Sequence, residues 1–73
     1  MTIISFDEVL ELKKACKEKF NEHVHFHDAC GGQYFTLETD SKEIRSFITD
    51  FMLAKKYRVN FSKNKMSFTL DNI

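Results

Sequence analysis

Three histidines alternate with apolar residues at positions 23–27, in the pattern His-x-His-x-His. On a β-strand, side chains two positions apart point to the same face and lie roughly 6.6–7 Å apart. Two neighbouring imidazoles can therefore converge on one metal ion, and Glu38, which we expect opposite His25, would add an oxygen ligand. The candidate metal ligands are thus His25, His27 and Glu38. No fourth ligand is evident, so the pattern favours a polar strand face that binds no cofactor.

Cys30 is a second candidate for chemistry, in the segment Asp28-Ala29-Cys30-Gly31-Gly32. A thiol beside a glycine turn is accessible, and it becomes a nucleophile when a base or a positive field stabilises the thiolate. His25 or His27 could be that base. Strand alternation, however, directs Cys30 and His27 to opposite faces, which favours a small semi-buried residue in a tight turn.

The elements that position these residues belong to a chain of 73 residues with no proline and eight phenylalanines. We expect one domain over residues 1–73, because a chain this short can form only one hydrophobic core. A core of this size supplies only about 3–5 kcal/mol of net stability. Two cysteines are too few for a small disulfide scaffold. No signal peptide or apolar run near 18 residues is recognisable, so we expect a cytoplasmic protein that does not bind membranes.

Charge is balanced overall but not along the chain. Eleven basic and eleven acidic residues give a formal net charge of zero, yet residues 1–40 carry four lysines and eight acids, and residues 41–73 carry seven bases and three acids. The two halves of so short a chain pack together. Because domains that bind nucleic acid strongly are usually net basic, nucleic acid is an unlikely partner.

Helical periodicity predicts two helices. The first spans about residues 5–20, with Ser5 and Glu8 as a capping box. Its predicted core stripe contains Val9, Leu12, Cys16 and Phe20, and Phe6 and Leu10 are expected to widen it. The second begins after Asp40 or Ser41 and ends near residues 55–56. Its predicted core stripe contains Ile44, Phe47, Ile48 and Phe51.

Alternating runs predict two hairpins. A turn at Gly31-Gly32 would set Phe26 opposite Leu37. A tip at Lys63-Asn64 would set Val59 opposite Phe68. Both registers place apolar side chains on one face, and burial of such a face is what normally determines how two strands pair. The residues predicted to face the helices are Val24, Phe26, Phe35, Leu37, Val59, Phe61, Met66 and Phe68.

The predicted fold class is α+β, with the order α-β-β-α-β-β and a four-stranded antiparallel sheet that has two helices on one face. Either the first and third strands or the second and fourth are central, and the sequence does not choose between these orders. Alternation also places Asp28 on the apolar face across from Phe35, where the carboxylate would need hydrogen-bond donors.

The opposite face of the predicted sheet is polar, as is common when an antiparallel sheet leaves one face to water. A rigid face of this kind can also fix side-chain geometry for binding. The candidate ligand-binding residues there are His25, His27, Tyr34, Glu38, Arg58 and Lys65. The remaining polar residues expected on it are His23, Thr36, Asn60, Ser62, Ser67 and Thr69.

The stretch His27-Asp28-Ala29-Cys30 resembles the signature Arg-Asp-Ala-Cys of the small bacterial RDAC family. Its last three residues match, and His27 stands in place of the arginine. The resemblance implies one compact bacterial domain with a functional hairpin tip, and it implies no particular reaction.

Two functions remain open from the sequence. We favour a non-enzymatic binding or accessory module that uses the polar sheet face or an edge strand to bind a protein or a small ligand. The alternative is a small metal- or thiol-dependent site at the first hairpin. The common phosphate-binding, redox and hydrolase motifs are missing, and we expect little room for a ligand pocket of about 300–1,000 Å³. The oligomeric state is left open.

Overall fold

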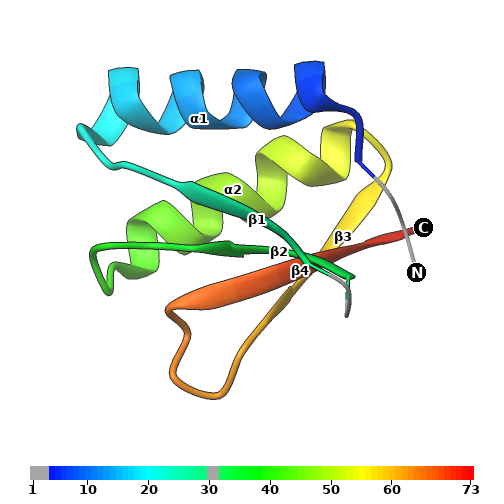
Figure 1. Ribbon diagram of the computed structural model, residues 1–73. Coiled ribbons are helices and arrows are strands. Elements are labelled where there is room, and N and C mark those ends of the chain that lie inside the picture. The colour runs from blue at the N-terminus through cyan, green and yellow to red at the C-terminus, as the bar shows by residue number, and fades with distance from the viewer. Residues whose placement is uncertain (1–3, 30–31) are drawn as a thin grey trace.

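The computed structural model in Figure 1 describes residues 4–29 and 32–73. The elements follow the predicted order: α1 (Phe6–Phe20), β1 (His25–Ala29), β2 (Gly32–Thr36), α2 (Lys42–Ala54), β3 (Tyr57–Phe61) and β4 (Ser67–Asn72). Both helices lie on the same side of one four-stranded antiparallel sheet (Figure 1). The predicted fold class is therefore confirmed. Within the described ranges, neither helix is long and apolar enough to cross a membrane.

Side chains at the helix starts satisfy backbone groups that a helix leaves unpaired. The Ser5 hydroxyl accepts the Glu8 N–H at 3.3 Å and donates to the Glu8 carboxylate at 3.0 Å, as expected for the first helix. Of the two candidates for the second cap, Ser41 is the one used, and its hydroxyl accepts the Ile44 N–H at 3.4 Å. α1 ends at Asn21, whose left-handed backbone (φ 55°) suits asparagine.

The core lies between the helices and the sheet. The buried helix residues are Val9, Leu12 and Cys16 of α1 and Ile44, Ile48 and Met52 of α2. Phe6 and Leu10, which were expected to widen the stripe of the first helix, are exposed instead. Phe47 and Phe51 are only partly buried, so their predicted place in the core stripe is correct only in part. They instead form the margin of the core, where the Phe47 ring meets Phe20 edge-on at 5.4 Å.

The strand order β1-β2-β4-β3 resolves the choice that the sequence left open. The second and fourth strands are central, and Phe35 of β2 stacks on Phe68 of β4 with 4.8 Å between ring centroids. β1 and β3 are the edges of the sheet.

The register predicted for the first hairpin is wrong by two residues. Phe26 pairs with Phe35 rather than with Leu37, and Ala29 pairs with Gly32. Gly32 is thus the first residue of β2 and not part of the turn, with a φ of 125° that a side chain would disfavour. Gly31 lies outside the described residues.

The register of the second hairpin is also wrong by two residues, because its loop is longer than predicted. Val59 pairs with Leu70, and the Ser62 N–H donates to the Ser67 carbonyl across a loop of residues 63–66. The Asn64 side chain accepts the Ser62 hydroxyl at 2.7 Å and the Met66 N–H at 3.0 Å, which pins this loop.

A shift of two residues keeps every side chain on its own face. The residues predicted to face the helices are accordingly buried or partly buried. Asp28 was also expected on the helix side of the sheet, but it is not buried there. It pairs with Gln33, and its side chain is exposed. Solvent reaches this end of β1, so the carboxylate does not need the donors that the sequence suggested.

Candidate binding site

The histidine row divides into separate contacts. His25 Nε2 lies 3.0 Å from Glu38 Oε2, so the predicted pairing of these side chains is present. In the observed register Thr36 stands opposite His25, and Glu38 approaches diagonally. A carboxylate only accepts, so His25 Nε2 carries the shared proton. This hydrogen bond lowers the pKa of Glu38 below its ordinary value, and the charge of Lys17 contributes less.

His27 forms a different contact, with the residue directly opposite on β2. Its ring stacks on Tyr34 with 4.6 Å between centroids and 10° between planes, and its Nε2 lies 3.1 Å from the Thr36 hydroxyl. His27 and Glu38 therefore have separate partners. Among residues 4–29 and 32–73, no group of three or more His, Cys, Asp or Glu side chains is placed to hold a metal ion. The predicted thiol, Cys30, lies outside the described residues.

Other polar residues of the open face pair with one another. The Asn60 amide donates to Asp71 at 2.6 Å, and Arg58 stands opposite Asp71 in the register. Asp71 was not among the residues predicted for the open face. Lys65 is not a strand residue: it lies in the loop between β3 and β4 with a φ of 62°.

A groove of about 360 Å³ lies between α1 and the segment that leads into β1. Its lining residues are Leu10, Lys13, Lys14, Lys17, Glu22, His23, Val24 and His25. The sequence did not predict it and indicated little room for a pocket. The spacing of the three lysines can be seen in the sequence. The sequence did not show, however, that residues 22–25 lie beside that face of α1.

The three lysines give the groove a positive rim. Lys17 Nζ donates to Asn21 at 2.7 Å and lies 3.2 Å from His23 Nε2. Because an ammonium only donates, His23 Nε2 accepts in this contact. Lys14 lies 3.9 Å from Glu18, with both side chains largely exposed, so this ion pair is weak. Among the described side chains, Lys13 has no ion-pair partner.

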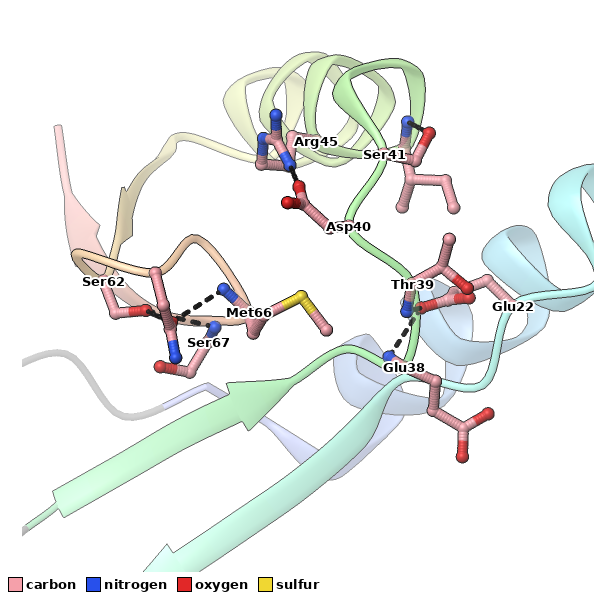
Figure 2. A network of polar contacts seen from close by, with 11 residues as sticks. Glu22, Glu38, Thr39, Asp40, Ser41, Arg45, Ser62, Met66 and Ser67 are labelled. Atoms are coloured by element: carbon pink, nitrogen blue, oxygen red, sulfur yellow. Dashed lines mark hydrogen bonds and ion pairs between the residues drawn. The ribbon is translucent and has the colours of Figure 1, made fainter.

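Glu22, at the back of the groove, is only 3% exposed. Its Oε2 accepts the backbone N–H groups of Glu38 at 2.8 Å and Thr39 at 3.0 Å (Figure 2). The carboxylate thus fastens the segment before α2 to the segment after α1. Alternation with Val24 and Phe26 placed Glu22 on the apolar face, and this was the signal that the sequence reading overlooked.

Cys16 is buried as predicted, with a free thiol and no exposed surface. Burial raises the pKa of this thiol to about 11, and the nearby Glu22 carboxylate adds to the effect. Cys16 is therefore a structural residue and not a nucleophile.

Comparisons of the chain with protein-family models, with curated proteins and with solved structures find no match. The resemblance of residues 27–30 to the RDAC signature stays a hypothesis.

Proposed function

We propose that this protein is a non-enzymatic binding module that holds an acidic ligand in the groove between α1 and the segment that leads into β1. The observation that carries the proposal is the shared position of Lys13, Lys14 and Lys17, which come from one face of α1 and line one groove. Ammonium groups bind carboxylates and phosphates through charge-assisted hydrogen bonds. A cytoplasmic location is part of this proposal, in keeping with the free thiol of Cys16.

The shape and lining of the groove support this reading. Its volume of about 360 Å³ is near the lower end of the roughly 300–1,000 Å³ typical of small-molecule sites. Leu10, which is 46% exposed, and the buried Val24 supply apolar surface. The lysine stems extend that surface while their charged ends stay in water. Glu22 does not oppose an anion strongly, because its carboxylate is turned toward two backbone N–H groups.

The open sheet face is the weaker candidate for ligand binding. His25 is engaged with Glu38, His27 with Tyr34, and Asn60 with Asp71. A ligand would have to replace these contacts before it gained any of its own. In the lysine groove less is exchanged: Lys13 has no ion-pair partner among the described side chains and the ion pair of Lys14 is weak, so only Lys17 would leave closer contacts, those with Asn21 and His23.

The proposal is tested by titrating the ¹⁵N-labelled protein with citrate at low ionic strength. We expect amide shifts concentrated at residues 10–17 and 22–25. The double variant Lys13→Gln, Lys17→Gln should bind at least about tenfold more weakly, which corresponds to ~1.4 kcal/mol. The control Lys42→Gln, Lys63→Gln removes the same charge from exposed sites elsewhere and should bind like the parent. Equal losses in both variants, or shifts spread over the whole surface, would refute the proposal.

A further inference from the structure

β1 is an edge strand, and of the features that usually protect such a strand it has only its short length and the charge of Asp28. It pairs with β2 through five consecutive residues, His25 to Ala29, without a bulge, and it contains no proline or lysine. An edge strand presents alternate backbone N–H and C=O groups with no strand partner, and proteins usually block such edges with those very devices. The outer side of β1 therefore has the backbone groups needed to accept one more strand.

The lysine groove lies at the start of this same edge, where residues 22–25 lead into β1. In Figure 1, α1 and β1 run in opposite directions and are joined by the short segment of residues 21–24. The groove is lined by α1 on one side and by residues 22–25 on the other. A strand that added to β1 and continued beside residues 22–24 would thus place helix-side residues at the groove, near the lysines of α1.

The spacing of the lysines matches the repeat of an extended chain. Lys13 and Lys17 are four residues apart on α1, a rise of about 6 Å. Alternate residues of a strand lie about 6.6–6.8 Å apart and point to the same face. Acidic side chains at alternate positions of an added strand would therefore each meet one lysine. Leu10, one turn before Lys13 and Lys14, would contact the next helix-side residue of that strand.

From these observations we infer that the acidic ligand is an extended segment of a partner protein, which adds to the edge of β1 with alternate acidic side chains on Lys13 and Lys17. The inference rests on the proposed function and specifies its ligand. A nucleic acid fits less well, because Asp28 and Glu38 are exposed near the same edge and would repel a continuous row of phosphates. A peptide can place its acidic residues only where the lysines are.

The test uses the full chain, labelled with ¹⁵N, and a capped seven-residue peptide that alternates threonine and glutamate. A matched peptide carries glutamine in place of glutamate. We expect the glutamate peptide to slow hydrogen exchange at outward-facing amides of β1 and to bind at least about tenfold more tightly than the glutamine peptide. Lys13→Gln with Lys17→Gln should weaken binding of the glutamate peptide by a similar factor. The control Lys42→Gln with Lys63→Gln should not.

The outcomes separate this inference from the proposed function. Citrate binding at the lysines without any peptide protection of β1 would overturn strand addition and leave the acidic-ligand module standing. If neither citrate nor the glutamate peptide binds, both the proposed function and the inference are overturned. If hydrogen exchange at β1 slows when the protein concentration is raised without any peptide, the edge binds a second copy of this chain. Tighter binding of a single-stranded oligonucleotide at the same lysines would assign it to nucleic acid. Either of these last two results also overturns the inference.

Discussion

Glu22 allows the sharpest test of what holds this fold together. Its carboxylate is 3% exposed, and one oxygen accepts two backbone N–H groups, those of Glu38 and Thr39. Glu22→Ala would leave both donors without their acceptor. A hydrogen bond to a charged group contributes about 1.5–3 kcal/mol, and a buried unpaired donor carries its own desolvation cost. We therefore expect a loss of about 3–5 kcal/mol, which is comparable to the whole stability of a domain this small.

Glu22→Gln should have a smaller effect. The two N–H groups converge on a single oxygen, Oε2, and an amide oxygen in that position can still accept from both. The variant loses the charge assistance, which roughly doubles the strength of such bonds, so we expect a cost of about 1–2 kcal/mol. Glu18→Gln is the matched control. Its carboxylate is exposed and 3.9 Å from Lys14, so removing its charge should cost under about 0.5 kcal/mol.

Urea unfolding followed by circular dichroism measures these differences, since the midpoint falls when stability falls at constant slope. Hydrogen exchange at the amides of Glu38 and Thr39 reports the contact directly, and it should speed up in the glutamine variant more than exchange in the centre of β4. If Glu22→Ala unfolds at the same urea concentration as the parent, Glu22 does not fasten these segments and the reasoning is wrong.

Three further predictions follow from burial and side-chain pairing. Ile48→Ala, at a fully buried site, should cost about 2–5 kcal/mol and more than Phe51→Ala, whose ring is partly exposed; thermal melts compare them. The Cys16 thiol, with its pKa raised from 9.0 to about 11, should resist a thiol reagent until the protein unfolds. Thiolate forms first in the unfolded chain, so stability should fall by about 2 kcal/mol as pH rises from 9 to 11, and Cys16→Ala should lessen that fall. Zinc should leave the melting temperature unchanged, because His25 and His27 have separate partners; a rise that disappears on replacing both with Gln would instead support the metal hypothesis.

The alternation of apolar and polar residues predicted the faces of the sheet correctly but not its register. Side-chain direction has a period of two, so any register shifted by two residues places the same side chains on the same face. The apolar pattern could not separate Phe26 opposite Phe35 from Phe26 opposite Leu37. That choice depends on the loops: the first connection lies one residue earlier than expected, between Ala29 and Gly32, and the second is longer than the two-residue tip that we expected.

Helix periodicity had a similar limit. It identified both helices and their caps, but it assigned Phe47 and Phe51 to the core and did not include Met52. A stripe of residues three and four apart is wide enough to rotate by one position on the core. Which edge of the stripe is buried depends on how α1 packs beside α2, and no local pattern in the sequence contains that information.

The lysine groove shows why charge counted along the chain was a poor guide to the binding surface. Residues 1–40 carry twice as many acidic residues as lysines, so this half of the chain has a net negative charge. Three of its four lysines nevertheless line one groove, while Glu22 is turned toward backbone N–H groups and Glu38 toward His25. Folding thus turns Glu22 and Glu38 toward other partners, while Lys14 keeps a weak ion pair with Glu18. Because exposed charges act mainly within about 8–10 Å at moderate ionic strength, the local arrangement decides what this surface attracts, and the charge of the whole half does not.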